Sequence, residues 1–329
     1  MGVPDPTMGM TRMRSRLAGH AIDLEFEPEA AHLADAFARQ VDADREPAGL
    51  TVSFRVDKRF VDSALRTMVG DSSHQRRGDT HVWLAAKPRH VQLLSPDPVS
   101  GRDAAVASVL LEQGHGLDGS LRARPGVEVI SAWAIGRDVL PVHASGIALG
   151  DRALILLGES GSGKTTTALA LAERGWNLLA DDRCFVYRHG SEVKAASLYA
   201  TAIVTETSLS RLEARNWRDL GVTHHGKQAR HLPSTIQIAA EAHLASVVWI
   251  SPDAGSLYNP VPLSRREALV PWQSALAPTL QAHGPSAGWL RNLADLSHAV
   301  PAWRMRVSWD FDRLDGALRE LVARGGPTT

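Results

Sequence analysis

The sequence is nearly devoid of cysteine. Its 329 residues include a single one, Cys184, so no disulfide can form within the chain. Such usage is typical of proteins that work in a reducing compartment. Cys184 lies in an apolar run, which predicts a small core residue rather than a reactive thiol.

Long apolar runs and a net charge are also missing. No segment approaches the roughly 18 uninterrupted apolar residues of a membrane span, and no apolar segment follows the basic residues near the N-terminus as in a secretory signal. Lys plus Arg and Asp plus Glu number 36 each, so no overall charge favours nucleic acid or an anionic membrane as a partner. We therefore expect a soluble cytoplasmic protein whose first 15 or so residues are disordered.

The patterns that are present divide the chain near residue 126. Hydrophobic residues make up 44% of the sequence, which suffices for a sizeable core, and the length suggests about two domains. Residues 1–126 show the pattern of a small α+β module, in which no catalytic constellation stands out. In this module we expect strands at 20–27, 50–56, 80–87 and 90–95, helices at 28–40 and 103–113, and a flexible loop at 70–79.

Residues 127–329 show the pattern of an α/β domain. Two alternating runs joined at residues 150–151 predict a hairpin, followed by a helix, a short buried strand and a second hairpin. Further strands are expected at 235–239 and 244–251. A helix is expected after Ser264, because Glu267 three residues later completes a capping box.

Residues 158–165 (GESGSGKT) match the phosphate-binding pattern G-x-x-x-x-G-K-[ST] at every fixed position, between an apolar strand and a helix. The glycines let successive backbone N–H groups point at an anion, and the helix N-terminus adds a partial positive charge. Lys164 supplies a full charge to the phosphates, and Thr165 offers a hydroxyl to Mg²⁺. The candidate nucleotide-binding residues are Gly158, Glu159, Ser160, Gly161, Ser162, Gly163, Lys164, Thr165 and Thr166.

Two adjacent carboxylates, Asp181 and Asp182, end the strand that follows this helix. Neighbouring residues of a strand point to opposite faces, so the two cannot do the same task while the strand stays regular. A carboxylate that accepts a hydroxyl proton and another that holds Mg²⁺ would suit phosphoryl transfer to an alcohol. The alternative is that the pair only ends the strand and starts a turn.

The segment PVHASGIALGDRALILLGESGSGKTTTALALAERGWNLLADD resembles the catalytic core of HPr kinase/phosphorylase and its relatives. The resemblance covers about residues 141–187 and implies a P-loop kinase domain of the HPr kinase and PEP carboxykinase-like type over 127–329, which uses ATP and Mg²⁺. It implies that Asp181 is the base for an attacking serine, that Asp182 lies on the metal side, and that His143 lies near the phosphates. A structural role for His143 within a sheet remains the alternative.

The sequence departs from the regulatory enzymes of that family downstream of the Asp pair. Their acidic-x-Arg-Gly signature is absent, and Glu206 is left as a substitute metal ligand or as an exposed loop residue. The basic loop HHGKQARHLP (224–233) carries Lys227 and Arg230, which predict either a mobile cationic loop that closes on the γ-phosphate or a plain surface loop. Its histidines lack partners with zinc-ligand spacing.

The loop SGSGKTT (160–166), the strand RGWNLLADD (174–182) and the segment PLSRREAL (262–269) resemble divergent members of this family that tailor ribosomally made peptides, including the C-terminal serine of lasso precursors. The leading hypothesis is therefore an ATP-dependent serine kinase of a peptide or small protein, with strands at 20–27 or 50–56 as a docking edge. The alternatives are a kinase of HPr or of a small-molecule hydroxyl, and a nucleotide-dependent switch or ATPase. A homo-oligomer remains open.

Overall fold

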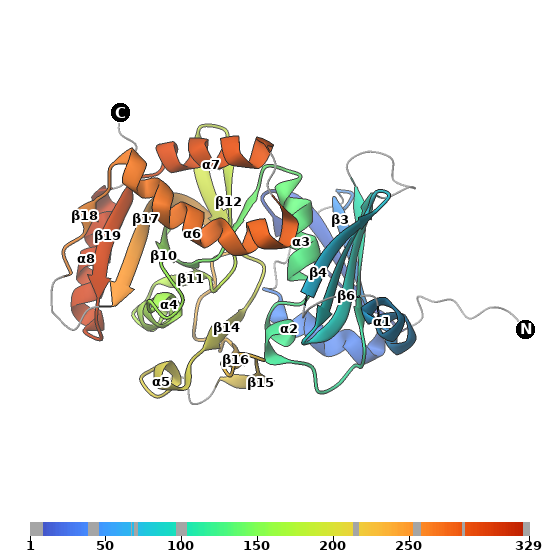
Figure 1. Ribbon diagram of the computed structural model, residues 1–329. Helices are drawn as coiled ribbons and strands as arrows, with labels where there is room; N and C mark the ends of the chain where they lie inside the picture. The colour runs from blue at the N-terminus through green and yellow to red at the C-terminus, as the bar shows by residue number, and fades with distance from the viewer. Residues whose placement is uncertain are drawn as a thin grey trace, which may run out of the picture.

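The computed structural model describes residues 9–38, 46–66, 68, 72–96, 104–212, 217–252, 258–284 and 287–324. They form two lobes that lie side by side, one from each part of the chain (Figure 1). Each lobe contains a large β-sheet of its own. None of the helices in these ranges has the length and apolar character that crossing a lipid bilayer requires.

The N-terminal sheet runs in the order β1-β2-β3-β7-β6-β5-β4. Its strands are β1 (Thr11–Leu17), β2 (His20–Phe26), β3 (Leu50–Val56), β4 (Ser72–Arg77), β5 (Thr80–Ala86), β6 (Arg89–Pro96) and β7 (Ala105–Leu111). The four strands predicted from alternating sequence are therefore present as β2, β3, β5 and β6. Because β2 and β3 lie inside the sheet, the edge strands are β1 and β4, and the predicted docking edges at 20–27 and 50–56 are wrong.

Three sequence predictions fail in this lobe because pairing partners override local pattern. Residues 105–111 form a strand, not a helix, since β7 bonds to β3 on one side and to β6 on the other. Residues 72–77 of the predicted loop form the edge strand β4, whose polar sequence suits an edge. Residues 11–15 are not disordered, because β1 pairs with β2 along its length; residues 1–8 lie outside the described residues.

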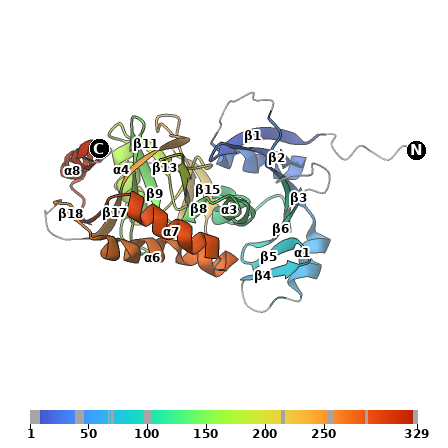
Figure 2. The same cartoon turned by 90° about the horizontal axis from the view of Figure 1, so that it is seen from above.

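Short helices cover both faces of the N-terminal sheet, because residues 28–36 and 127–135 pack in one core cluster and Val61 packs in another with Val82 and Leu84. The predicted helix at 28–40 is a 3₁₀-helix, η1 (Pro28–Ala36), which buries Leu33 and Ala36. The other helices of this part are α1 (Lys58–Leu65), α2 (Gly119–Ala123) and α3 (Val127–Ile135). Helix α3 packs its Ile130 and Trp133 into the core of the N-terminal lobe and lies between the lobes (Figures 1 and 2).

The second sheet has the main order β11-β9-β10-β17-β13-β12-β8, and β19 pairs with β17 and β18. Its strands are β8 (Leu140–Val142), β9 (Ser145–Leu149), β10 (Arg152–Leu157), β11 (Asn177–Ala180), β12 (Cys184–His189), β13 (Glu192–Ala196), β17 (Glu241–Pro252), β18 (Val261–Pro262) and β19 (Ala302–Val307). Both predicted hairpins are confirmed as antiparallel pairs, β9 with β10 and β12 with β13.

Helices cover both faces of this sheet: α6 (Arg265–His283) and α7 (Ala287–Ala299) on one, α4 (Lys164–Ala172) and α8 (Phe311–Arg324) on the other (Figures 1 and 2). Along β10, Leu154 and Leu156 belong to the core of α4 and α8, whereas Ile155 and Leu157 belong to the core of α6 and α7. A strand buried on both faces explains the uninterrupted apolar run that precedes the P-loop.

The second lobe also carries a small sheet, β14-β16-β15, beside helix α5 (Glu206–Leu209). Its strands are β14 (Thr201–Val204), β15 (Arg218–Val222) and β16 (Gln228–His231). The predicted capping box at Ser264 is confirmed, because its hydroxyl accepts from Glu267 N and the Glu267 carboxylate accepts from Ser264 N. The strand predicted at 235–239 is wrong: only Ile238 forms an isolated bridge, to Leu178.

The two lobes share one hydrophobic core. Phe185 and Tyr187 of β12 pack in the same cluster as Phe26, Phe54 and Trp133 from the N-terminal part. The hydroxyl of Tyr199 also donates a hydrogen bond to the carbonyl of Pro125, 3.1 Å away. The predicted boundary at 126/127 therefore falls inside a continuous packed region.

Candidate functional site

The glycine-rich loop lies between β10 and α4, as its sequence predicts. Gly161 (φ 83°) and Gly163 (φ 94°) adopt left-handed backbone angles that favour glycine. A Cβ at Gly158 would lie 2.6 Å from the carbonyl oxygen of Ile250 and 2.5 Å from the hydroxyl of Ser162, so no larger residue fits there without a shift. The loop therefore has the shape of a backbone anion-binding nest at a helix N-terminus.

Lys164, the first residue of α4, is buried beneath this loop. Its Nζ donates to the carbonyl oxygens of Gly158 at 2.8 Å and Glu159 at 3.0 Å. Burial lowers the pKa of Lys164, the Asp181 carboxylate opposes that shift, and Lys227 adds to it. Lys164 thus supplies a desolvated cation at the phosphate-binding loop.

Asp181 is almost fully buried, with 6% of its surface exposed. Its Oδ1 accepts from the hydroxyls of Thr165 at 2.6 Å and Ser145 at 3.0 Å, and its Oδ2 accepts from the N–H of Ile203 at 2.9 Å. These donors hold the carboxylate against the hydroxyl that a P-loop offers to Mg²⁺. That position suits a metal-side carboxylate and does not match the base role assigned to Asp181 from the sequence.

Asp182 leaves the strand through a tight turn. It has φ 63°, unusual for a residue with a side chain, and Arg183 N donates to Asp181 O at 2.7 Å across it, the bond of a γ-turn. This turn ends the alternation of the strand. Asp182 consequently borders the cavity, in ion-pair contact with Arg124 and 3.2 Å from His143 Nδ1. Its position suits a base and does not match the metal-side role assigned from the sequence.

Asp182 has one neutral and one cationic neighbour, His143 and Arg124. Burial, followed by the positive charges of Lys164 and Arg183, lowers the pKa of His143 to about 3, so the ring is neutral at pH 7. Because a carboxylate only accepts, the short contact makes Nδ1 the protonated nitrogen. Burial lowers the pKa of Arg124 to about 10, so this side chain stays cationic at pH 7.

Arg124 comes from the segment after α2, within the module in which the sequence analysis found no catalytic constellation. A lone arginine in a polar stretch carries no sequence signal that could have marked it. Its contact with Asp182 exists because the two lobes pack together. The N-terminal part of the chain therefore contributes directly to the candidate site.

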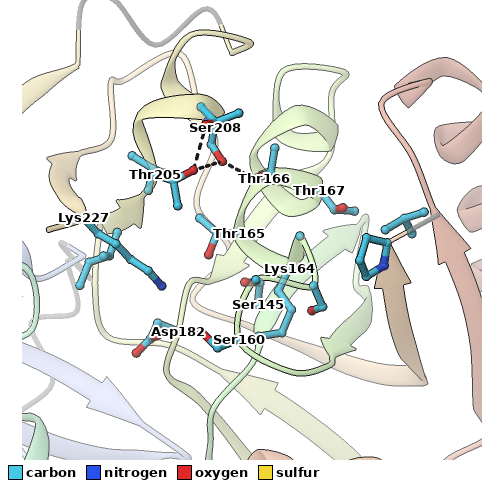
Figure 3. Close-up of a pocket in the computed structure, with 18 of the residues that line it drawn as sticks. Ser145, Ser160, Lys164, Thr165, Thr166, Thr167, Asp182, Thr205, Ser208 and Lys227 are labelled. Atoms are coloured by element: carbon cyan, nitrogen blue, oxygen red, sulfur yellow. Dashed lines mark hydrogen bonds between the residues drawn. The ribbon is translucent and has the colours of Figure 1, made fainter. Parts of the chain in front are cut away.

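Of the three other charged residues predicted for the site, the fold brings only Lys227 to the cavity. Lys227 lies in the turn between β15 and β16 and borders the cavity, where its Nζ is directed toward the space between Thr165 and Asp182 (Figure 3). Arg230 lies on β16 and pairs with Asp219 instead. Glu206 is exposed in the first turn of α5 and does not line the cavity. The predicted loop at 224–233 is largely the tip and second strand of a β-hairpin.

A cavity of about 250 Å³ joins these groups. The P-loop and the start of α4 form its floor, and Figure 3 shows Lys227 and Asp182 across it from α4. Two hydroxyls that no sequence pattern marked, those of Thr205 and Ser208, also line it: Ser208 Oγ lies 2.6 Å from Thr166 Oγ1 and 2.9 Å from Thr205 Oγ1. Trp309 and Phe311 also line the cavity. None of these positions carries a recognisable motif.

The side chains present fit a nucleotide and Mg²⁺. A hydroxyl and a carboxylate oxygen 2.6 Å apart, on Thr165 and Asp181, are the hard oxygen ligands that Mg²⁺ prefers. The glycine nest, Lys164 and the N-terminus of α4 fit polyphosphate oxygens. Within the described ranges, no three His, Cys, Asp or Glu side chains gather as a metal site.

The sequence matches no protein-family model and no curated protein. Among solved structures, the chain is similar to the HPr(Ser) kinase/phosphatase from Coxiella burnetii, with 13% identity and a TM-score of 0.33. That similarity covers 55% of this chain and 95% of the other. A likeness at this level assigns no function to the chain.

Proposed function

We propose that this protein is an ATP- and Mg²⁺-dependent kinase that transfers the γ-phosphoryl group to a serine hydroxyl of a peptide or small protein. The observation that carries the proposal is the division of labour between neighbouring carboxylates. Asp181 is bonded to Thr165 beside the phosphate nest, and Asp182 borders the same cavity next to a neutral histidine. An alcohol kinase needs both functions a few ångströms apart.

In the proposed reaction, Asp182 takes the proton of the acceptor hydroxyl as its oxygen bonds to the γ-phosphorus. The bond from that phosphorus to the β–γ bridging oxygen breaks, and the nucleoside diphosphate leaves with the bond's electron pair. ATP supplies the phosphoryl group. Thr165 and Asp181 would hold Mg²⁺, which would supply neutralisation of charge on the leaving phosphates. Lys164 and Lys227 balance the negative charge that spreads over the transferred group.

The neutral ring of His143 donates its Nδ1–H to Asp182 and so orients the carboxylate without adding a charge beside it. Arg124 holds the other side of Asp182. The reversal of the two aspartate roles follows from these contacts, because only Asp182 borders the space that an acceptor can enter. Asp181 is enclosed by donors on both oxygens.

The choice of a peptide serine as acceptor is supported by the resemblance of the loop SGSGKTT (160–166), the strand RGWNLLADD (174–182) and the segment PLSRREAL (262–269) to peptide-tailoring kinases. A C-terminal serine of a ribosomally made precursor is the narrowest form of the proposal. HPr and small-molecule alcohols are the competing acceptors, and transfer to water would make the protein an ATPase. Measuring phosphoryl transfer to a panel that contains all of these acceptors ranks them in one assay.

The test measures transfer from γ-labelled ATP to that panel, together with the affinity for ATP. Asp182→Asn should abolish transfer, with a loss of about 100-fold or more for a general base, and should keep ATP affinity within a few-fold. Asparagine tolerates the left-handed backbone of position 182, so the variant should fold. Asp138→Asn is the matched control, because Asp138 also has a left-handed φ of 59° and does not line the cavity.

Asp181→Asn should instead raise the Mg²⁺ concentration needed for half-maximal activity. Normal transfer by Asp182→Asn would rule out the base role. If the label appears only as inorganic phosphate and every acceptor stays unlabelled, the protein is an ATPase and not a kinase. Absence of ATP binding by the wild-type protein would refute the proposed function as a whole.

A further inference from the structure

Part of the cavity is built by the end of β19 and the segment that follows it. Val307, Trp309 and Phe311 line it together with Pro252 at the end of β17. This segment lies directly beside the P-loop, since a Cβ at Gly163 would be 3.9 Å from Val307 Cγ2. Phosphates held by the loop would therefore have the rest of a nucleotide within reach of these aromatic side chains.

Trp309 has 47% of its surface exposed, whereas the other tryptophans whose side chains the structure describes are buried or half-buried. Arg211 covers its ring, with the guanidinium carbon 3.9 Å from the ring centroid. Phe311 meets it edge to face, with centroids 5.9 Å apart at 84°. The indole is thus fixed by two neighbours while a large part of it stays uncovered at the cavity.

An uncovered aromatic ring beside a phosphate nest has a clear physical use. Nucleobases stack on aromatic side chains, and replacing such a side chain by alanine typically weakens binding by about tenfold or more. A cation over one face also fixes the ring in place through the ring quadrupole.

We propose that Trp309, braced by Arg211 and Phe311, binds the nucleobase of the nucleotide by stacking. This inference rests on the proposed function only in requiring that a nucleoside triphosphate occupies the P-loop. It assigns recognition of the base to the C-terminal segment 307–311, separate from the phosphate and acceptor groups. Affinity for the base and catalysis of transfer should therefore be separable.

The experiment compares binding of MgATP with binding of Mg-tripolyphosphate, which has the phosphates and lacks the base, by titration calorimetry. The wild-type protein should bind ATP about tenfold or more tighter than tripolyphosphate. Trp309→Ala should remove that difference by weakening ATP while leaving tripolyphosphate unchanged. Trp309→Phe should restore most of it. Phe60→Ala is the matched control, because Phe60 is 43% exposed on α1 and does not line the cavity.

The outcomes separate this inference from the proposed function. Unchanged tripolyphosphate affinity in Trp309→Ala shows that the phosphate site is still folded. If wild type and Trp309→Ala bind ATP equally, or if ATP binds no tighter than tripolyphosphate, the stacking role is wrong while the kinase proposal stands. If neither ligand binds the wild-type protein, both fail.

Discussion

The hydrogen-bond partners of single residues determine what each carboxylate of the site can do. Both oxygens of Asp181 accept bonds from protein donors, so this side chain is held in one orientation. Asp182 has a left-handed backbone and charged or polar neighbours on two sides. Strained backbone of this kind persists only where surrounding contacts impose it, and it gathers at functional sites.

The neutral state of His143 predicts how stability depends on pH. Its folded-state pKa is about 3, below the value of about 6.5 expected in the unfolded chain. Below pH 6.5 the histidine binds a proton in the unfolded chain but not in the folded protein. The free energy of unfolding should therefore fall as pH is lowered from about 6.5 toward 3. Above pH 6.5 the stabilising contribution of the neutral ring is fully present.

Urea denaturation at several pH values measures this dependence. His143→Gln should show a shallower decline of the free energy of unfolding between pH 6.5 and 4. Part of the decline should remain, because burial also lowers the pKa of His90. An identical slope in variant and wild type would mean that His143 is not held neutral by the fold.

At the scale of elements, the loop between β10 and α4 depends on close approach of backbone at one glycine. Gly158→Ala would place a methyl group 2.6 Å from the Ile250 carbonyl, a backbone atom of β17 that cannot rotate away. We expect a loss of about 1–3 kcal/mol in the free energy of unfolding, typical of overpacking, and at least tenfold weaker tripolyphosphate binding.

Gly316→Ala, in helix α8, should change the free energy of unfolding in the opposite direction. Gly316 lies inside α8, and no atom lies within 4 Å of an added Cβ. Alanine at an exposed helix-interior position should raise the free energy of unfolding by about 0.5–1 kcal/mol and leave ligand binding unchanged. Thermal denaturation and calorimetry of the two variants side by side check both expectations; a neutral Gly158→Ala would contradict the close approach.

At the scale of the whole molecule, the lobes are joined by packing and by the site itself. Phe185 belongs to a strand of the second sheet, yet its fully buried ring is part of the N-terminal core. Arg124 crosses in the other direction, from the N-terminal part to Asp182. The candidate site is therefore complete only when both lobes are folded and docked.

Phe185→Ala should accordingly destabilise both lobes together. Deleting a buried phenylalanine ring costs about 3–5 kcal/mol, and a shared core should transmit this loss to a single cooperative transition. Urea unfolding followed by tryptophan fluorescence and by far-UV circular dichroism should give coincident curves, shifted to lower urea in the variant. Phe60→Ala should shift them by no more than about 0.5 kcal/mol. Two separate transitions would show that the lobes unfold independently.

The amino-acid sequence alone determined the phosphate-binding loop, its strand and helix, both hairpins and the nearby pair of aspartates. Each is a local pattern: glycine spacing at 158–163, alternation along β9 and β10, and the capping box at Ser264 depend on residues close together in the chain. Local geometry follows from local sequence when no distant partner competes for the same backbone groups.

Only the tertiary structure decided which aspartate borders the cavity, because that depends on a turn at Asp182 and on Arg124 brought from another lobe. It also made residues 105–111 a central strand, since β3 and β6 supply backbone partners that no local pattern reveals. Trp309 reached the P-loop for the same reason, being 146 residues after Gly163 (309 − 163) and joined to it only by sheet pairing and packing. Contacts between distant segments contribute energies that cannot be inferred from residues adjacent in the sequence.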